Sequence, residues 1–528
     1  MSKLEKVVSD QLFTKVTDMS NLKAKVFFRN PKHYINFELP PYFQFEDIML
    51  YANSMLIKKT VKDICMKDGK GNPKLPGGFE GVNYTILSNK DGGFAWRPLQ
   101  IIHPVLYGDL VNIMTDKGSW KEITELFSRQ KDSSVECISI PLESNTDESS
   151  RAAQVSNWWD KIEQESLRKS IDYKFMFQTD ISNCYPSIYT HSLEWAICPG
   201  GRIKIKTDRA KGEKPRNIGT EIDKRLRYMN QDQTIGIPQG STLMDFIAEI
   251  VLAGTDLELT ERLKDEFPAQ SRYSILRYRD DYRVFSDEYQ VGHSIMKILN
   301  DVLSKWNMKM NVSKTSETSD ILSNSIKQEK MEELYTAPIR HSYQKEAMRI
   351  YMLSKRYPNS GLIAKKLTDF YDRISRTKTI KRLDYEVAVA IVTMIAYYSP
   401  KYMSQTASIV SLLIDRSENS LDRESVINKI INKFSDIPNT ELIDIWLQRI
   451  TSVEDIFTHT FASEITKVAI GKSDNSVLWN SNWLSKANRD LINNAQISSL
   501  RGDIDSGEHS PVVEREEFAL YRREGYQW

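Results

Sequence analysis

The chain has 528 residues, of which 40% are hydrophobic and 27% charged, and its net charge is only +1. This length predicts two or three domains with a sizeable core, and the composition is typical of a soluble globular protein. No apolar run approaches the ~20 residues that span a bilayer, and the N-terminus lacks the apolar core of a signal peptide. The four cysteines form no CxxC pair, which argues against a zinc knuckle or a disulfide framework. We therefore expect no membrane association and a reducing, cytoplasmic environment.

Two regions are predicted before the most informative motifs begin. Residues 1–60 predict a mostly helical N-terminal region, and residues 61–325 carry the strand signals. Within the second region, the run 97–104 is strand-like and bounded by prolines, whereas the polar stretch 129–154 has the composition of an exposed connection. The stretch 202–227 holds ten Lys or Arg against four Asp or Glu. Such a stretch predicts either a surface that follows a phosphate backbone or a solvated loop.

From residue 173 the pattern sharpens into a strand, a turn and a hairpin. Residues 174–180 form a buried-strand pattern that ends on an acid. The Gly/Pro turn 236–241 follows, and its last residue, Ser241, is suited to be the N-cap of a long helix from Thr242 towards Lys264. Residues 278–281, Tyr-Arg-Asp-Asp, then form a tight turn between two strand patterns.

The two adjacent carboxylates of this turn, Asp280 and Asp281, decide its interpretation. Taken alone they fit a solvated hairpin tip, because Asp favours turns. Like charges a few ångström apart repel unless a cation lies between them, and hard divalent cations such as Mg²⁺ take oxygen ligands. Asp180, at the end of the earlier strand, can converge with them on a metal pair that clamps an in-line phosphoryl displacement. The order of these segments, closed by a strand end at Lys314, predicts the palm of a nucleotidyl transferase.

The C-terminal part of the chain has a different character. Strand signals fade, and apolar residues recur at helical spacing between short breaks. Such segments suggest packed helix pairs, as in an α-solenoid. Helices of this kind are expected at residues 385–398, 405–414, 425–434 and 441–450. We predict an α+β fold in which polymerase fingers and palm precede an all-α, helical-repeat-like domain, with parts 1–60, 61–325 and 326–528.

Several segments resemble the motifs of the reverse transcriptase family. They are Arg97-Pro98, Thr179–Tyr185, Gly236–Ser241, Tyr278–Asp281 and Asn311–Thr315. The resemblance covers roughly residues 90 to 320 and implies a right-hand polymerase that adds dNTPs with two Mg²⁺ ions, for which Mn²⁺ substitutes. It assigns metal binding to Asp180, Asp280 and Asp281, with the carbonyl of Ile181 as a backbone ligand.

The resemblance also implies contacts with the incoming dNTP. Tyr185 stands where the family places an aromatic ring under the sugar, so that a 2′-hydroxyl would clash; otherwise it is a core tyrosine. Gln239 and Gly240 would let the backbone approach the nascent base pair, since glycine leaves space for close contact. Lys314 and Arg97 are candidates for neutralising the triphosphate, or else surface cations.

Within that family, the chain is most similar to the bacterial abortive-infection and defence-associated enzymes, through residues 40–43, 103–107 and 185–195. Members of that group synthesise DNA on a dedicated non-coding RNA, or without a template from a protein tyrosine, and several form trimers or hexamers. The resemblance therefore implies phage defence in a bacterial cytoplasm, with dNTPs, nucleic acid and further copies of the chain as partners. Two other readings stay open: a non-catalytic nucleic-acid-binding assembly protein that uses the palm as a scaffold, and an RNA-dependent RNA polymerase.

One residue departs from the family signature, and four are candidates for priming. The second position of Tyr-x-Asp-Asp is usually small or apolar, but here it is Arg279. Its side chain would either bind a primer or template phosphate or fold away. Protein priming would need an exposed tyrosine hydroxyl that reaches the metals. Candidates are Tyr521 and Tyr526 near the C-terminus and Tyr34 and Tyr42 near the N-terminus, all of which can instead be structural.

Overall fold

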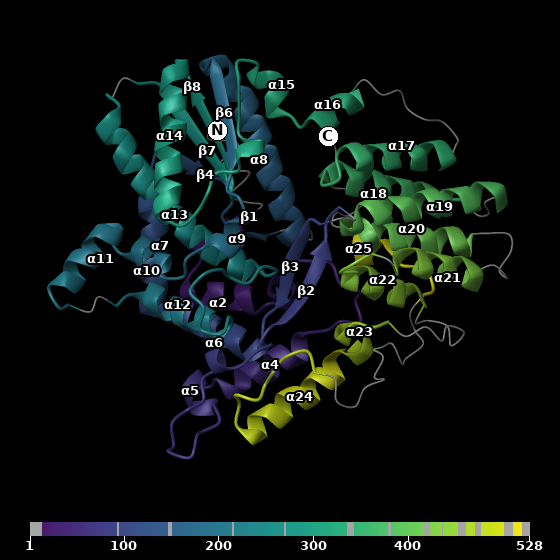
Figure 1. The fold of residues 1–528 in the computed structure, drawn as a ribbon, viewed down its shortest axis with the longest axis horizontal. Helices are drawn as coiled ribbons and strands as arrows, with labels where there is room; N and C mark the ends of the chain where they lie inside the picture. The colour runs from purple at the N-terminus through teal and green to yellow at the C-terminus, as the bar shows by residue number, and fades with distance from the viewer. Residues whose placement is uncertain are drawn as a thin grey trace.

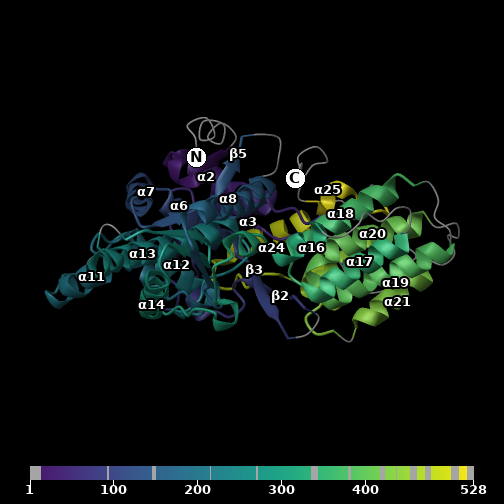
Figure 2. The same cartoon turned by 90° about the horizontal axis from the view of Figure 1, so that it is seen from above.

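The structure, a computed structural model, describes most of the chain. The described residues are 13–91, 94–145, 150–213, 216–268, 271–334, 343–377, 382–416, 423–435, 437–451, 461–469, 477–500 and 510–519. They form two bodies with a hairpin of two strands, β2 and β3, between them (Figure 1, Figure 2). Within these ranges no helix combines the length and apolarity needed to cross a membrane. All four cysteines carry free thiols.

The first body is built on a five-stranded sheet in the order β4–β7–β8–β6–β9. β4 runs parallel to β7, and the other neighbours are antiparallel. Successive side chains face opposite sides, so that Phe177 and Val284 enter the large core whereas Met176 and Phe285 join a small cluster with Ile321. The strands are β4 (Val135–Cys137), β6 (Phe175–Asp180), β7 (Tyr273–Tyr278), β8 (Asp281–Ser286) and β9 (Ser316–Thr318).

Helices and two small antiparallel pairs of strands complete the first body. The pairs are β1 (Phe13–Lys15) with β5 (Leu142–Ser144), and β2 (Tyr84–Asn89) with β3 (Trp96–Ile101). The helices up to the palm are η1 (Val16–Asp18), α2 (Asn21–Arg29), α3 (Pro31–Tyr34), α4 (Glu46–Met55), α5 (Val61–Ile64), η2 (Pro76–Gly78), α6 (Pro104–Met114), α7 (Lys117–Lys131) and α8 (Ser150–Asp172). Those that follow are α9 (Cys184–Ser187), α10 (Ser192–Ile197), α11 (Gly201–Ala210), α12 (Ile218–Tyr228), α13 (Thr242–Glu266), α14 (Tyr289–Lys305), η3 (Val312–Lys314), α15 (Ile321–Ser325) and α16 (Gln328–Leu334).

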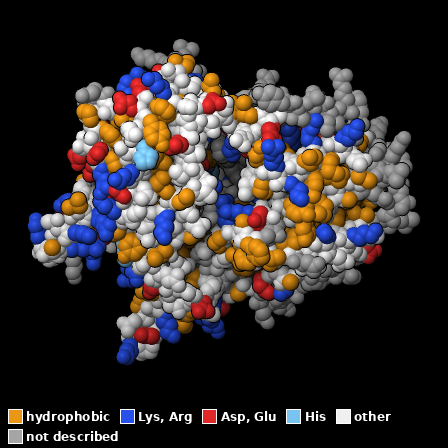
Figure 3. Space-filling model, turned by 45° about the horizontal axis from the view of Figure 1, so that its top comes forward, with side chains coloured by type: hydrophobic (Ala, Val, Ile, Leu, Met, Phe, Trp, Pro, Cys, Tyr) orange, Lys and Arg blue, Asp and Glu red, His pale blue; other side chains and the backbone are white. Residues whose placement is uncertain are grey.

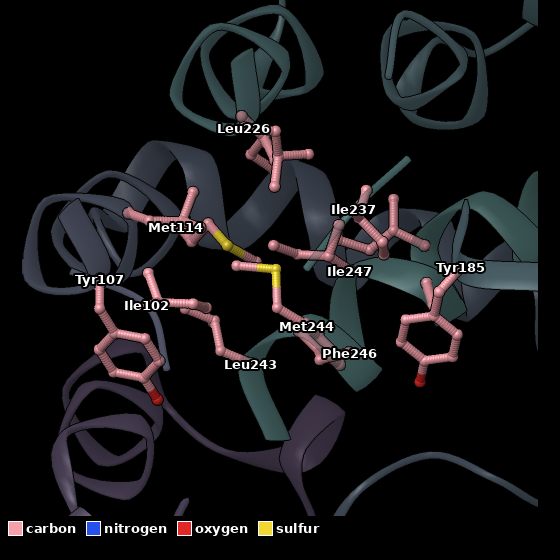
Figure 4. Close-up of a cluster of buried hydrophobic side chains, with 14 of the residues drawn as sticks. Ile102, Tyr107, Met114, Tyr185, Leu226, Ile237, Leu243, Met244, Phe246 and Ile247 are labelled. Carbon is pink, nitrogen blue, oxygen red and sulfur yellow. The ribbon is translucent and has the colours of Figure 1, made fainter. Parts of the chain in front are cut away.

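The long helix α13 runs through the middle of this core. The hydroxyl of Ser241 accepts from the backbone N–H of Met244 at 3.3 Å, which confirms the predicted N-cap and the predicted helix. Residues 242–256 of α13 are all buried, as expected for a helix inside a core, whereas its last turns reach the surface. Figure 4 shows Met244 and Phe246 of α13 within the apolar cluster and Tyr185 at its edge.

The second body consists of helices in the residues that the structure describes there. They confirm the four predicted helical segments, and their apolar faces form a separate core. The helical-repeat character stays a prediction. The elements are α17 (Tyr343–Arg356), α18 (Gly361–Ser375), α19 (Arg382–Tyr398), η4 (Pro400–Tyr402), α20 (Met403–Asp415), α21 (Arg423–Phe434), α22 (Glu441–Thr451), α23 (Glu464–Ala469), α24 (Lys486–Leu500) and α25 (Arg515–Phe518).

The last of these helices turn back onto the first body. α24 packs against α4, and the indole N–H of Trp479 donates to the carbonyl of Ile101 at 2.9 Å. The backbone N–H of Met66 donates to the carbonyl of Trp483 at 2.8 Å. Both tryptophans are fully buried in the large core. The division into parts 1–60, 61–325 and 326–528 stays a prediction. The packing shows in addition that buried side chains of α23 and α24 join the core of the first body.

Two expectations about strands are corrected. The stretch 129–154, predicted as an exposed connection, contains β4, which forms an edge of the sheet, and β5. Each of these strands has only three residues, too short for a two-residue period to be recognised. Lys314 does not end a strand: it closes the 3₁₀ turn η3, and β9 begins two residues later.

The basic stretch 202–227 folds into α11 and α12 rather than a loop. Several of its cations are paired within the protein. Arg209 contacts the buried Glu194 at 2.5 Å, and Arg225 contacts Asp109 at 2.9 Å. A carboxylate that pairs with a cation offsets part of its positive charge. These pairs therefore leave the stretch with less positive charge for binding a phosphate backbone.

Candidate active site

Two of the three predicted carboxylates face each other across the centre of the sheet. Asp180 ends β6 and Asp281 begins β8, and they are directly opposite in the register. Asp280 precedes Asp281 in the turn, where its carbonyl accepts from the N–H of Ile181 at 3.0 Å. Ile181, the predicted backbone ligand, is buried at this point. Antiparallel pairing thus brings the ends of two strands, about 100 residues apart in the chain, to one place.

The pKa values of the carboxylates reflect the repulsion between like charges that the sequence predicted. Burial, followed by the charges of Asp280 and Asp180, raises the pKa of Asp281 to about 7. Burial also raises the pKa of Asp280, and the charge of Asp180 adds to that shift. Lys314 forms an ion pair with Oδ2 of Asp180. This pair, together with the charges of Asp281 and Asp280, outweighs the burial of Lys314 and raises its pKa. The site therefore holds more negative charge than one lysine compensates.

These carboxylates suit a hard divalent cation, although they do not form a closed metal site. Among the described residues, no three His, Cys, Asp or Glu side chains are grouped closely enough to hold a metal ion. Oδ1 of Asp180, however, is buried without a hydrogen-bond partner. An orphaned carboxylate oxygen in a repelling cluster is the kind of donor that Mg²⁺ takes, and the residues present therefore fit the predicted metal.

The β7–β8 turn has an unusual backbone. Arg279 has φ +52°, a left-handed conformation that costs a non-glycine residue roughly 1–2 kcal/mol. Three contacts hold it there. Its N–H donates to the hydroxyl of Ser139 at 2.8 Å, and its carbonyl accepts from the guanidinium of Arg277 at 3.1 Å. Its own guanidinium pairs with Asp245 at 3.0 Å. The side chain thus folds onto α13, one of the two outcomes considered for it.

A buried ion network supports this turn from inside the protein. Arg277 is fully buried and contacts both oxygens of Asp256, at 3.0 and 2.8 Å, and Glu249 at 2.9 Å. Tyr282 and Gln130 donate to the same Asp256. A buried ion pair is favourable only when its remaining hydrogen-bonding groups are satisfied. These contacts provide partners for Arg277 and Asp256, and they hold β7 in place beside β8, the strand that begins with Asp281.

Tyr185, the predicted residue under the sugar, shares Asp245 with Arg279. Its hydroxyl donates to Oδ1 of Asp245 at 2.5 Å, while Oδ2 accepts from Arg279 and, at 3.0 Å, from Asn36. The ring lies at the edge of the apolar cluster with its hydroxyl pointing away from the cluster (Figure 4). Tyr185 is therefore both packed on the core and held at its polar end, which fixes the ring in one orientation.

Gln239 and Gly240 are placed next to β3 and the N-terminal segment. The carbonyl of Gln239 accepts from the N–H of Gln100 at 2.7 Å, and that of Gly240 from Asn36 at 2.9 Å. Gly240 has φ +134°, and a Cβ there would come within 3.0 Å of the Phe37 ring. The space at this glycine is thus filled by the protein itself, which gives a structural reason for it besides the predicted approach of a base pair.

The predicted triphosphate contacts come from two separate elements, η3 and β3. Lys314 lines a cavity of about 310 Å³ together with Asp180 and Asp281. Arg97 stands exposed on β3. Surrounding protein lowers its pKa, and the charge of Asp280 opposes that shift, which places Arg97 within electrostatic reach of the turn. The structure therefore brings both cations to the carboxylates from different elements.

The four candidate priming tyrosines are not gathered at this site. Tyr34 and Tyr42 are each 1% exposed. The hydroxyl of Tyr34 donates to the carbonyl of Ile102, and that of Tyr42 lies 3.3 Å from the side-chain oxygen of Gln448. Neither meets the requirement of an exposed hydroxyl. Tyr521 and Tyr526 lie outside the described residues.

Sequence reasoning missed several residues that shape the site. Ser139, Asp245, Glu249 and Asp256 carry its hydrogen bonds and ion pairs. Glu249 and Asp256 are buried acids on α13, seven residues apart and thus on one face. Buried acids on a core helix require partners, so their spacing was the one pattern that could have predicted a buried cation such as Arg277.

A comparison with protein families matches part of the chain. Residues 117–351 match the model described as "Reverse transcriptase (RNA-dependent DNA polymerase)". This stretch is a reverse transcriptase domain, and it includes all three carboxylates, Tyr185 and Lys314. Arg97 and the β2–β3 hairpin precede the matched residues. No curated protein sequence matches the chain.

Solved structures similar to this chain include yeast telomerases. Apo telomerase from Candida tropicalis has a TM-score of 0.30 at 13% identity, over 76% of this chain and 73% of that one. Telomerase from the same organism with a TWJ fragment of telomeric RNA has a TM-score of 0.28 at 14% identity, over 69% and 63%. The Candida albicans enzyme with the same kind of fragment has 0.24 at 13%, over 72% and 66%.

Proposed function

From the reverse transcriptase domain at residues 117–351, we propose that the chain is a DNA polymerase that adds dNTPs by phosphoryl transfer. The observation that carries the proposal is the pairing of Asp180 with Asp281 across β6 and β8, with one oxygen of Asp180 buried and unpartnered. Reverse transcriptase domains generally use divalent metals. Two Mg²⁺ ions, or Mn²⁺ in their place, would be held by Asp180, Asp280, Asp281 and the carbonyl of Ile181, and would stabilise the attacking and leaving oxygens.

The chain's own residues would position the reactants. Tyr185, fixed through Asp245, would lie under the sugar of the nucleotide and exclude a 2′-hydroxyl. Arg97 of β3 and Lys314 of η3 would neutralise the triphosphate beside the carboxylates. Positioning and charge neutralisation account for most of the catalysis in phosphoryl transfer, and this set of residues offers both.

We further propose a role for this activity in bacterial phage defence by abortive infection, in the cytoplasm and as a trimer or hexamer. The support is the sequence resemblance at residues 40–43, 103–107 and 185–195. DNA would be made either on a non-coding RNA or without a template from a protein tyrosine. Plaque counts on cells that carry the wild-type gene or an Asp280→Asn gene test the defence role. Equal counts from the two genes would contradict it.

Nucleotide incorporation by the purified protein tests the enzymatic proposal. We expect labelled dNTPs, but not rNTPs, to be incorporated in the presence of Mg²⁺, and EDTA to abolish the reaction. Preferential incorporation of rNTPs would instead indicate an RNA polymerase. A protein that binds nucleic acid but incorporates neither substrate, with or without added template and primer, would indicate a non-catalytic assembly protein.

The nucleic acid that co-purifies with the protein separates the two modes of synthesis. A defined RNA implies templated synthesis, whereas attached DNA of random or homopolymeric sequence implies priming by the protein. In the second case, mass spectrometry of tryptic peptides should find a nucleotide on a tyrosine, and Tyr521 and Tyr526 are the remaining candidates because Tyr34 and Tyr42 are buried. Active protein without any tyrosine adduct would exclude protein priming.

A further inference from the structure

Positive charge from three separate segments surrounds the approach to the carboxylates. The β2–β3 hairpin supplies Lys90 and Arg97, the chain after α14 supplies Lys314 and Lys327, and η4 of the second body supplies Lys401. We call these five residues the cationic cluster. Figure 3 shows basic side chains at the hollow between the two bodies. Only Arg97 and Lys314 were candidates from the sequence.

The palm side of this cluster lines a defined cavity. Lys314 and Lys327 border the same 310 Å³ space as Asp180 and Asp281. Burial lowers the pKa of Lys327, and the charges of Glu329 and, next, Asp281 oppose that shift. Lys327 therefore lies close enough to Asp281 for their charges to act on each other. A cavity lined by both carboxylates and lysines is suited to a ligand that carries metal ions and phosphates together.

Lys401 brings the second body into this site. It lies in the turn η4, which packs against β2, and its side chain is exposed, with Nζ 3.5 Å from the carbonyl of Asn359. Surrounding protein lowers the pKa of Lys401 to about 8, and the charges of Arg97, Lys327 and Lys90 add to the shift. The ammonium thus stands at a solvent-accessible wall, near three other cations.

Contacts with the second body hold the hairpin in place. Tyr84 of β2 donates to Glu441 of α22 at 2.5 Å, and Asn89 donates to the carbonyl of Pro438 at 3.3 Å. Ser404 of α20 donates to Glu38, in the segment that precedes α4. The hairpin and η4 are therefore fixed against each other, and the convergence of their cations is a property of the fold rather than of flexible surface side chains.

Charge balance indicates what this arrangement binds. In the free protein, Asp180, Asp280 and Asp281 offset part of the cluster's charge. Divalent cations on these carboxylates would remove that compensation and leave like charges close together, which is unfavourable without an anion. The cations converge on one place beside the carboxylates instead of following an extended groove. This geometry matches a compact polyanion better than a strand, whose phosphates are spread along its backbone.

We propose that Lys401 and Lys327, with Lys90 and Arg97, bind the phosphate groups of the incoming nucleoside triphosphate, so that the C-terminal helices form one wall of the nucleotide site. This inference rests on the proposed polymerase function. It adds to that function a nucleotide-binding role for residues outside the fingers and, for Lys401, outside the matched domain.

Triphosphate binding without turnover tests the inference. The probe is dTTP with Ca²⁺ in place of Mg²⁺, titrated calorimetrically into the full-length protein. We expect Lys401→Ala and Lys327→Ala each to weaken binding by about 5- to 20-fold, as for loss of a charge-assisted phosphate contact. Lys401→Arg, which keeps the charge, should bind within about 3-fold of wild type. The matched control is Lys433→Ala on α21, on the side of the second body away from the hairpin (Figure 1), which should not change binding.

The outcomes separate this inference from the polymerase proposal. If Lys401→Ala binds dTTP as wild type does while its unfolding temperature is unchanged, the inference is wrong, whether or not the protein polymerises. If the variant binds a single-stranded oligonucleotide more weakly but dTTP normally, Lys401 contacts a strand and the inference is also wrong. A protein without polymerase activity whose dTTP binding depends on Lys401 would refute the proposed function and keep the site.

Discussion

The palm and the C-terminal helices bury their polar groups in different ways. In the palm, charged side chains converge: Arg277 with Asp256 and Glu249, and the carboxylates with Lys314. In the helical core, the buried hydroxyls of Ser408 and Thr406 mostly return to carbonyls of their own helix. One buried ion pair between Arg449 and Glu517 is present among the described residues there.

This difference assigns the candidate reactive groups to the palm and a stabilising role to the C-terminal helices. Buried charge is expensive to maintain and is concentrated where a reaction needs it, whereas an apolar helical core stabilises the fold without offering reactive groups. Among the described residues, the second body packs on β2 through the turn η4 and holds the hairpin and the first core in place through Tyr84 and Trp479. If this comparison is right, substitutions in the two regions should fail in different ways.

The largest effect should come from the palm carboxylates. We expect Asp280→Asn to lower dNTP incorporation by about 10³-fold or more, because metal-held charge neutralisation carries most of the reaction. Its free energy of unfolding should equal or exceed that of wild type, because burial raises the pKa of Asp280 and its charged form is unfavourable in the fold. Incorporation assays and urea unfolding measure the two quantities.

The control for this substitution is Asp287→Asn at the end of β8, where the carboxylate pairs with Arg272 at 3.1 Å on the surface. This variant should keep its activity, because a surface ion pair contributes little to stability. If Asp280→Asn kept a tenth of the wild-type rate, the palm would not be the centre of the chemistry, and the comparison between the regions would be broken.

The next effect separates the buried charges of the palm from its reactive ones. Arg277→Met leaves Asp256 and Glu249 buried without their cation, which should lower the free energy of unfolding by about 3–5 kcal/mol. Activity should be lost together with stability, unlike in Asp280→Asn. Arg272→Met, an arginine on the same strand region but exposed, should change stability by no more than about 0.5 kcal/mol. Equal stability of the two variants would show that the network does not support the turn.

The sequence predicted the parts of this site that are local. The strand before Asp180, the cap at Ser241 and the Asp280-Asp281 turn depend on short patterns of residues, and the structure has all three elements. The three-residue strand β4 and the return of Trp479 and Trp483 to the first core depend on partners far away in the chain. No periodicity within a segment indicates which distant surface it covers.

The cationic cluster was hidden for the same reason. Lys401 lies in the short break between the predicted helices 385–398 and 405–414, more than 200 residues after Asp180, and only tertiary packing brings η4 to β2. Arg279 shows the opposite case: its departure from the expected small residue was visible in the sequence, but its partner Asp245 lies on a helix that the pattern marks as core. Local patterns thus identified the reactive acids better than the residues that position them.

A pH effect of intermediate size should reveal the contact between α6 and the C-terminal segment that packs on the first body. His103 is fully buried, and its Nδ1 accepts from the N–H of Val105 while Nε2 lies 3.1 Å from the hydroxyl of Ser481. Burial lowers its pKa to about 3. Since the unfolded chain binds the proton first, stability is complete above pH 6.5 and falls as the pH drops towards 3. From pH 7 to pH 4 the loss from this group is roughly 3 kcal/mol.

Other groups titrate in the same range, so the informative quantity is the difference between wild type and His103→Asn. Asparagine keeps a side-chain oxygen that can cap α6 but does not titrate. The variant should be less stable than wild type at pH 7 and lose less stability on acidification. Parallel stability curves for the two proteins from pH 7 to pH 4 would show that protonation of His103 does not weaken the packing of the C-terminal segment that contains Ser481.

The smallest effect should come from Arg279, and it concerns how precisely the palm positions its substrate. Arg279 and Tyr185 hold the two oxygens of Asp245. Removal of the guanidinium in Arg279→Ala leaves Asp245 free to shift and loosens Tyr185, which would lie under the sugar. We expect preference for dNTP over rNTP to fall by about 3- to 10-fold, equal to roughly 1 kcal/mol, with little change in the Mg²⁺ concentration that gives half-maximal rate.

Competing incorporation of dNTP and rNTP measures this preference, and product length and composition show whether primer or template use changes as well. Asp245→Asn should lower the preference in a similar way, because it weakens both contacts, and the double variant should add little to either single one, as expected for residues that act through a shared partner. Additive losses would mean that Arg279 acts on the nucleic acid directly. An unchanged preference in Arg279→Ala, with altered product length, would give the same conclusion, and the turn would then bind substrate rather than position the tyrosine.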